Sequence, residues 1–170
     1  MKLTKDNAFL ILSILGGILW GVWRVFLLSE GDLHALTASL RHFVDYFDTR
    51  SISLASIGES LLRNGHTLVL VWICSKFPKL FWASYLLLYL KAMTLAFSIT
   101  LMVQAFGAFG IIMGFALNLP QNILITAMCI YIMKKGDNNK KLIALAGLLA
   151  LALACFYEVF LSAILFSMLI

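Results

Sequence analysis

The sequence predicts an all-α protein, a single integral membrane domain over 1–170 that folds as a bundle of about five transmembrane helices. Apolar residues make up 62% of the chain and charged residues only 12%, whereas soluble domains are roughly half apolar and about a quarter charged. A chain this small cannot hide so much apolar surface from water. The apolar residues also gather into runs of about 20, the length that spans a bilayer. This composition excludes a soluble enzyme, a disulfide scaffold and a disordered linker.

The first predicted span covers about 8–29 and follows Lys2 and Lys5. A secretory signal peptide also begins with basic residues, but its apolar core is only about 7–15 residues long and a small-residue cleavage site follows it. Here the polar stretch 29–32 follows directly, without such a site. We therefore expect an uncleaved transmembrane helix.

The segment 31–50 is predicted to be an amphipathic helix. Its apolar residues recur at helical spacing with polar residues between them, and it is too polar to span. We expect it to lie in the membrane interface, to cap the bundle or to meet a partner. The candidate partner surface consists of Phe43, Asp45, Phe47 and Asp48.

The second span, about 52–76, carries more polar residues than the others. To cross the membrane it must take Glu59, Arg63, Asn64 and His66 with it. Glu59 and Arg63 are four residues apart, so they share one helix face and can pair. Such groups normally face the protein interior or a cavity. The alternative is a re-entrant half-helix.

The third span, about 80–103, contains a lysine near its middle. Pro78 separates this span from the second, because proline lacks a backbone donor. A mid-span lysine costs about 2.5–3.5 kcal/mol on insertion scales. We expect Lys91 to face the bundle, with Glu59 or Glu158 as its partner.

The fourth span, about 108–134, follows a turn expected at 104–107. We expect it to be broken at membrane depth by the motif Asn118, Leu119, Pro120, Gln121 and Asn122. Neighbouring protein or water must satisfy the backbone groups that such a break releases. The fifth span, about 141–168, carries Glu158.

Loop charges predict the orientation of these five spans. The tail before the first span and the 76–79 turn are basic, and the 134–141 turn has four lysines against one aspartate. The 30–65 region has five acidic residues against three arginines. The positive-inside rule then places the N-terminus in the cytoplasm and the C-terminus outside the cell membrane. A re-entrant second segment would invert the later loops and destroy this agreement.

No motif of a soluble catalytic site is present. The chain lacks a phosphate-binding GxxxxGK[ST] loop, a zinc-binding HExxH and a nucleophile elbow GxSxG. The histidines are not spaced as a metal site, and the three cysteines lie far apart in apolar stretches, which predicts small buried side chains. We expect no enzyme, cofactor, metal or nucleic-acid partner. The weaker alternative is an intramembrane acid–base pair of Glu59 and Glu158; ion pairing with Arg63 and Lys91 is favoured.

Glycines recur one helical turn apart in two spans. Gly17 and Gly21 form a GxxxG pattern in the first span, and Gly110 and Gly114 form another in the fourth, after Gly107. Such spacing lets two helix backbones approach closely. It predicts either tight packing within the chain or the seam of a homo-oligomer.

The stretch 107–122, a glycine-spaced helix that leads into Leu-Pro-Gln-Asn, resembles the signature of the stage II sporulation protein M family. The glycines of the first span, the amphipathic segment and the five-span outline are also similar. One departure lies in the third span, where family members often carry glycines and this chain has Ala92 and Ala96.

The resemblance implies a scaffold in the septal membrane during endospore formation. The family protein gathers two cell-wall hydrolases, stage II sporulation proteins D and P, and the assembly thins septal peptidoglycan for engulfment without the scaffold itself being a hydrolase. The alternative reading is a transporter, or the membrane subunit of one, including the ABC type. Its polar path would be lined by Lys91, Glu59 and Glu158.

Overall fold

The computed structural model describes residues 5–48, 54–77, 79–135 and 140–161, and every regular element in these ranges is helical. The predicted all-α fold class is confirmed. The helices are α1 (Lys5–Phe26), α2 (Glu30–Asp48), α3 (Leu54–Lys76), α4 (Phe81–Phe106), α5 (Ala108–Lys135) and α6 (Lys140–Phe156), followed by a π-helical turn, η1 (Tyr157–Leu161).

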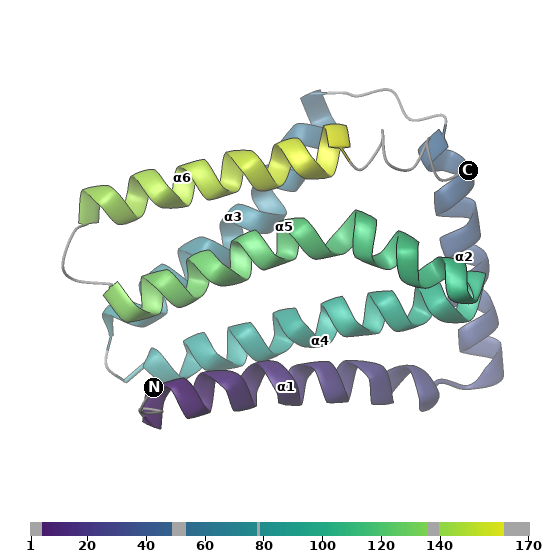
Figure 1. Ribbon diagram of the computed structural model, residues 1–170, viewed down its shortest axis with the longest axis horizontal. Coiled ribbons are helices and arrows are strands. Elements are labelled where there is room, and N and C mark those ends of the chain that lie inside the picture. The colour runs from purple at the N-terminus through teal and green to yellow at the C-terminus, as the bar shows by residue number, and fades with distance from the viewer. Residues whose placement is uncertain (1–4, 49–53, 78, 136–139, 162–170) are drawn as a thin grey trace.

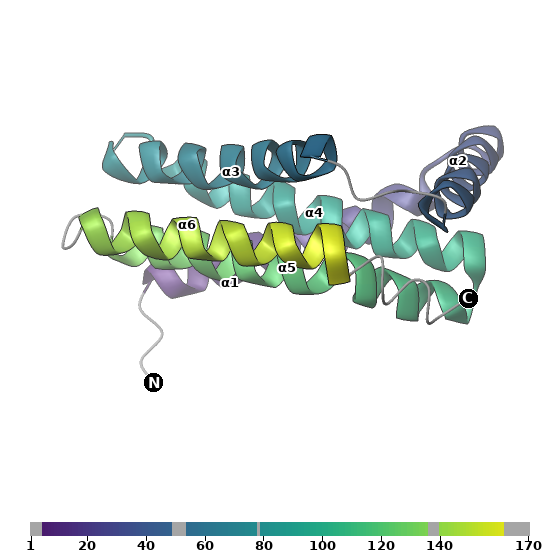
Figure 2. The same cartoon turned by 90° about the horizontal axis from the view of Figure 1, so that it is seen from above.

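Five long helices lie alongside one another and α2 runs across one end of them (Figure 1). The helices α1, α4, α5 and α6 follow in order across the bundle (Figure 1), and α3 lies in a second layer (Figure 2). There α3 contacts α4, α5 and α6. This arrangement leaves α2 outside the bundle, where it contacts α4.

Four helices of the described chain are long and apolar enough to cross a membrane: 7–26, 81–106, 108–134 and 141–160. The chain is thus a multi-pass helical membrane protein. The polar residues of α3 keep it out of this set. However, α3 is one continuous helix of 23 residues, roughly 34 Å at 1.5 Å per residue, and it packs against three helices of the bundle.

The basic helix ends gather at one end of the bundle. The start of α1, the end of α3, the end of α5 and the start of α6 lie together at the left of Figure 1. Lys5, Lys76 and Lys141 belong to these ends. The opposite end holds α2 and the turn between α4 and α5. The helices α1, α3, α4, α5 and α6 therefore alternate in direction along the bundle.

Two features of the helices differ from the sequence-based expectation, and the first is the turn between α4 and α5. The turn expected at 104–107 shrinks to Gly107, because α4 continues to Phe106 and α5 starts at Ala108. Gly107 adopts a φ of +63°, a conformation that favours glycine. Its N–H donates to Val103 O at 2.8 Å, and its carbonyl accepts from Gly110 N at 3.0 Å. One residue is therefore enough to reverse the chain.

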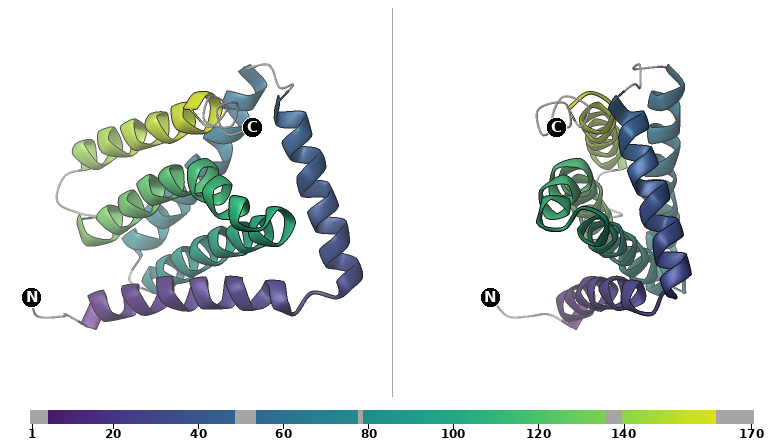
Figure 3. Two further views of the ribbon diagram at one scale, coloured as in Figure 1. Left: turned by 45° about the vertical axis from the view of Figure 1, so that its right-hand side comes forward. Right: turned by 90° about the vertical axis from the view of Figure 1, so that its right-hand side faces the viewer.

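The second difference concerns the expected break in the fourth span. The helix α5 is continuous from Ala108 to Lys135 with Pro120 inside it. It bends in its middle instead of breaking (Figure 3). A neighbouring side chain, Tyr157 of η1, donates to the carbonyl that Pro120 leaves without its helical donor.

The glycines of α1 pack against α4 within the chain. A Cβ at Gly17 or Gly21 would lie 2.3 Å from a main-chain oxygen of α4 and 3.0 Å from the Cβ of Ala92 or Ala96. The two helices therefore approach until their backbones touch, which is the packing that GxxxG spacing allows. The alanines of the third span take part in this contact although they are not glycines.

The glycines of α5 make the equivalent contact with the preceding helix. A Cβ at Gly110 would lie 2.0 Å from Met102 O. A Cβ at Gly114 would lie 3.2 Å from the side chain of Ile99. Together with the one-residue turn at Gly107, these positions let α4 and α5 form a close antiparallel pair.

The main core lies between α3, α4, α5 and α6. It includes Leu68, Leu88 and Ile125, all almost fully buried. Cys129 and Cys155 are buried and Cys74 is half-buried. Many large apolar side chains are exposed on the outer faces of the helices, as expected where lipid replaces water as the solvent.

Candidate functional site

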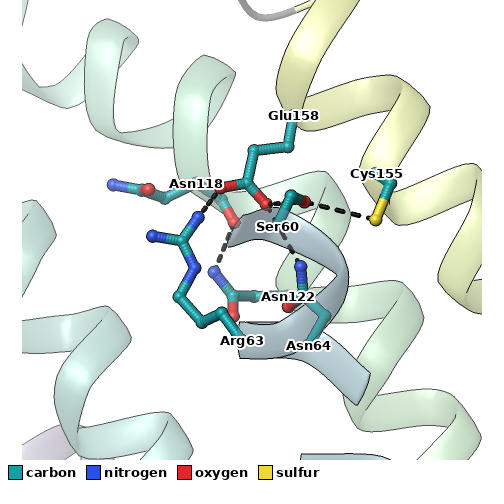
Figure 4. Close-up of polar contacts among 7 residues, drawn as sticks. All are labelled: Ser60, Arg63, Asn64, Asn118, Asn122, Cys155 and Glu158. Atoms are coloured by element: carbon teal, nitrogen blue, oxygen red, sulfur yellow. Dashed lines mark hydrogen bonds and ion pairs between the residues drawn. The ribbon is translucent and has the colours of Figure 1, made fainter. Parts of the chain in front are cut away.

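A polar cluster joins α3 to the π-helical turn η1. Successive turns of α3 bring Ser60, Arg63 and Asn64 to one face, and η1 presents Glu158 to it (Figure 4). Glu158 Oε2 accepts hydrogen bonds from Ser60 Oγ at 2.6 Å and from Asn64 Nδ2 at 3.1 Å. Glu158 Oε1 forms an ion pair with Arg63 Nη2.

The residues of the cluster differ in how much of each side chain is exposed. Ser60 and Asn64 are each 3% exposed, and the side chain of Glu158 is 18% exposed whereas that of Arg63 is 66% exposed. Ser60 Oγ also lies 3.3 Å from Cys155 Sγ. The carboxylate thus has partners for both oxygens, as a charge placed among apolar helices requires.

The π-helical turn also explains why α5 does not break at its proline. Pro120 has no N–H, so the carbonyl of Ala116, four residues earlier, loses its usual helical donor. The hydroxyl of Tyr157, the first residue of η1, donates to Ala116 O instead. Asn122 Nδ2 adds a bond to Asn118 O at 2.7 Å. Side chains therefore satisfy backbone groups at membrane depth, and the helix continues with a bend.

A cavity of about 430 Å³ lies beside the polar cluster. Its walls come from the middle parts of three helices: Arg63, Asn64, His66, Thr67 and Leu70 of α3; Leu87, Leu90, Lys91, Thr94, Leu95 and Ser98 of α4; and Asn118, Gln121 and Asn122 of α5. Because these positions lie near the centre of each helix, the cavity lies at mid-bundle. Its lining combines polar side chains with four leucines, which come from α3 and α4.

Lys91 lines this cavity and is half-buried, so it faces the bundle as expected. The expected carboxylate partner is not there. Glu158 binds Arg63 instead, and within the described ranges no carboxylate forms an ion pair with Lys91. Glu59 is exposed and does not line the cavity. Of the charges that the sequence predicts within the membrane, Arg63 and Glu158 form an ion pair and Lys91 lines a cavity.

Gln121 is the second notable group in the cavity wall. It is 6% exposed, and its Oε1 accepts no hydrogen bond within the part of the chain that the structure describes. Buried polar atoms are nearly always paired, so an unpaired one needs an explanation. Sequence reasoning had placed Gln121 only in a helix-breaking motif, and it gave no role to Ser60 or Tyr157.

The other motif positions have different places. Leu119 is half-buried in α5 and does not line the cavity. Phe43, Asp45, Phe47 and Asp48, the candidate partner surface, belong to α2, but their side chains lie outside the described residues. Among described residues, no group of three or more His, Cys, Asp or Glu side chains is arranged to hold a metal ion.

Side chains near the middle of α2 attach it to the bundle. Arg41 Nη2 donates to Ala105 O near the end of α4, at 3.0 Å. Leu40 packs against the small apolar cluster of Met102 and Met113. This end of the bundle is the one opposite the basic helix ends (Figure 3).

No family model, curated protein or solved structure matches this chain.

Proposed function

We propose that this protein is a transporter, or the membrane subunit of one, that binds a small polar solute in the cavity between α3, α4 and α5. The observation that carries the proposal is the placement of Lys91 and Gln121 in that cavity, half-way along their helices. Ionisable residues at such depth are costly and commonly mark solute paths. A proline-bent helix beside a polar site is also a feature of transporter binding sites.

The neighbouring polar cluster supports this reading, because Arg63 and Glu158 already neutralise each other. Lys91 is not needed to hold that pair together. A lysine with only a structural role would be expected to bind a carboxylate or to reach the membrane surface. Within the described ranges Lys91 forms no ion pair with a carboxylate and lines a cavity half-way along its helix, which favours a role for its charge.

Proteoliposome swelling tests the proposal. Stopped-flow light scattering would follow entry of a neutral polyol, a small organic anion and a small organic cation. We expect one class to enter faster than in empty liposomes, and Lys91→Gln to abolish the difference. Lys79→Gln, which removes a lysine at the α3–α4 turn instead, should behave as the wild type. Rates equal to empty liposomes for all three solutes would eliminate this proposal.

The second candidate is a membrane scaffold, and the placement of α2 favours it. A helix held across the end opposite the basic ends would lie outside the cytoplasm. Its residues 34–36 and 41–42 are exposed and could meet a partner. Together with the resemblance to the stage II sporulation protein M family, this supports recruitment of hydrolases that resemble stage II sporulation proteins D and P.

Co-purification tests the scaffold. Wall hydrolases of these two types should be retained by the full chain in detergent and lost when residues 31–50 are replaced by an unrelated amphipathic helix. A matched control replaces exposed apolar residues of α6, such as Leu145 and Leu149, with alanine. An unchanged set of partners after replacement of 31–50 would contradict the scaffold.

Both candidates share one topology, which we also propose: α3 is a fifth span, with the N-terminus in the cytoplasm and the C-terminus outside. The gathering of basic helix ends supports it. Cysteines introduced at Asn138 in a cysteine-free background should react with an impermeant maleimide only after cell lysis. Labelling from outside intact cells would refute this topology.

A further inference from the structure

We infer that the cavity between α3, α4 and α5 takes an oxyanion, a carboxylate or a phosphate, and that Glu158 competes with this ligand for Arg63. This inference rests on the proposed function, since it names the class of solute that the same cavity would take. It is argued from the charge of the lining, the depth of its two cations, its N–H groups and the place of Arg63 between the cavity and Glu158.

The described lining of the cavity carries basic side chains and no acidic one. Lys91 and Arg63 are cations and His66 is a third basic residue, whereas no aspartate or glutamate is among the described residues of the wall. Glu158 contacts Arg63 from η1 but does not line the cavity. Unlike charges attract far more strongly at low dielectric than in water, and like charges repel as strongly. The lining therefore favours an anion and disfavours a cation.

The two cations lie at similar depths in the bundle. Because α3 and α4 are consecutive and run in opposite directions, positions equally far from their connection lie at about the same depth. Arg63 lies 13 residues before α3 ends at Lys76, and Thr94 lies as far after α4 begins at Phe81. Lys91 is less than one helical turn from Thr94, roughly 4.5 Å along the axis. Both cations line the same cavity, so one oxyanion can lie between them.

The donors that the lining offers are N–H groups. Its hydroxyls, those of Thr67, Thr94 and Ser98, each donate to a main-chain oxygen of their own helix. Asn122 Nδ2 donates to Asn118 O at 2.7 Å, and an amide nitrogen carries a second hydrogen. Ammonium, guanidinium and amide N–H groups suit the ionised oxygens of a carboxylate or a phosphate, which only accept hydrogen bonds.

Arg63 belongs both to the cavity wall and to the polar cluster. Its Nη2 forms the ion pair with Glu158 Oε1, and its side chain is largely exposed, which leaves it room to turn. Glu158 Oε2 keeps its hydrogen bonds from Ser60 and Asn64 if the guanidinium turns toward the cavity. The carboxylate of Glu158 and the ligand therefore compete for one guanidinium. Such competition lowers the apparent affinity by the fraction of molecules in which Arg63 is available.

Binding to the full-length wild-type chain in a neutral detergent is the first test. Propionate, propionamide and propylammonium are similar in size and differ in charge, and inorganic phosphate is the second oxyanion. Titration calorimetry should show propionate or phosphate binding at least tenfold more tightly than propionamide and propylammonium. An affinity for propionamide or propylammonium that equals the affinity for both oxyanions would count against the inference.

A lipid headgroup is a second source of the same chemistry, and a parallel arm tests it. Native mass spectrometry of protein released from nanodiscs compares retention of anionic phosphatidylglycerol with retention of phosphatidylcholine, which has no net charge. Greater retention of phosphatidylglycerol that is lost in Lys91→Gln and kept in Lys79→Gln would identify a lipid phosphate as the ligand. Retention that Lys91→Gln leaves unchanged would place the lipid elsewhere. Absence of an oxyanion preference at the cavity in both arms, absence of binding included, would overturn the inference.

Substitutions of Lys91 test the charge of the cavity. Lys91→Gln should weaken binding of the preferred oxyanion at least tenfold. Lys91→Arg keeps the charge and should stay within threefold of the wild type, and Lys79→Gln should not differ from it. Equal affinities of the wild type and Lys91→Gln would overturn the role of this lysine. The wild-type comparison needs no variant, so a variant that misfolds leaves the first test intact.

Glu158→Gln tests the competition, because glutamine removes the charge and retains an oxygen for the buried donors of Ser60 and Asn64. The preferred oxyanion should then bind at least threefold more tightly, whereas a purely structural ion pair predicts unchanged or weaker binding. Arg63→Gln, at a largely exposed side chain, should weaken binding at least threefold and remove the effect of Glu158→Gln. Unchanged or weaker binding in Glu158→Gln would overturn the competition. Unchanged binding in Arg63→Gln would also overturn it, and this variant decides alone if Glu158→Gln does not fold.

The binding tests and the flux assay separate the possible failures. Oxyanion binding without flux would support this inference and refute the transport proposal. Entry of a cation or a polyol, with no preference for an oxyanion in either binding arm, would support transport and refute this inference.

Discussion

Two regions of the bundle hold helices together by opposite means. In the first, which we call the glycine seam, Gly17, Gly21, Gly110 and Gly114 bring α1 and α5 against α4. In the second, the polar cluster of Ser60, Arg63, Asn64 and Glu158, hydrogen bonds to one carboxylate join α3 to η1. Lipid supplies no hydrophobic driving force between helices, so close packing and interhelical hydrogen bonds are the available sources of association.

The glycine seam has a structural role, whereas the polar cluster lies beside the candidate functional site. In the glycine seam, backbone touches backbone and no room is left for a ligand. The polar cluster borders a cavity, and its satisfied carboxylate contrasts with Lys91 and Gln121 near it. Rigid packing of α4 by the glycine seam would hold one wall of the cavity in place.

The strongest way to break the glycine seam is Gly110→Ala, because the new Cβ would lie 2.0 Å from Met102 O, a main-chain atom. The helices must separate, and overpacking of this kind costs about 3 kcal/mol. Equilibrium unfolding in mixed detergent micelles, followed by circular dichroism, would measure the loss. Gly58→Ala in α3 meets nothing within 4 Å and should be neutral or slightly stabilising. Equal losses for the two variants would show that the seam is not in close contact.

The second-largest expected effect is a difference in stability loss between two substitutions in the polar cluster. Glu158→Ala leaves the buried donors of Ser60 and Asn64 without their acceptor, at a cost of about 2–3 kcal/mol. Arg63→Ala should cost about 1 kcal/mol, because Glu158 keeps two hydrogen bonds and Arg63 is itself largely exposed. The same unfolding assay would measure both. A larger loss for Arg63→Ala than for Glu158→Ala would refute this description of the cluster.

The third prediction concerns the bend in α5. Tyr157→Phe removes the donor to Ala116 O and should cost about 1 kcal/mol of unfolding free energy. Pro120→Ala restores a main-chain N–H to the same carbonyl. In that background, Tyr157→Phe should therefore have little effect. Equal costs in the two backgrounds of this double-mutant cycle would show that the tyrosine does not replace the missing helical bond.

Much of the fold was predictable from local sequence because its signals are local. Apolar runs located α1, α3, α4 and α5 within a few residues of their observed ends, and Pro78 lies between α3 and α4 in the sequence. The predicted end of the fifth span at 168 lies outside the described residues. Glycine spacing indicated close packing, although the pattern alone could not show that α4 is the partner. The one-residue turn at Gly107 was missed because 104–106 is compatible with helix as well as with a turn.

The candidate site was only partly predictable, because its contacts join distant residues. Arg63 and Glu158 are brought together by the packing of α3 against η1, and no local spacing reveals a π-helical turn. The proline motif indicated a break, but the hydroxyl that satisfies Ala116 O comes from Tyr157 on another helix. Lys91 was recognised as a costly mid-span charge, yet only the packing shows that it faces a cavity.

The smallest expected effect concerns α2, whose attachment combines both kinds of contact. The last carbonyls of a helix lack intrahelical donors, and Arg41 supplies one to Ala105 O while Leu40 packs on Met102. Arg41→Ala should change the unfolding free energy of the bundle by less than about 0.5 kcal/mol, since surface substitutions rarely do more. It should nevertheless speed amide hydrogen exchange severalfold in residues 33–42 and leave α4 unchanged, because only α2 loses an anchor. Arg24→Ala, at an exposed arginine near the end of α1, is the control. Unchanged exchange in α2 would mean that apolar packing alone holds it across the end of the bundle.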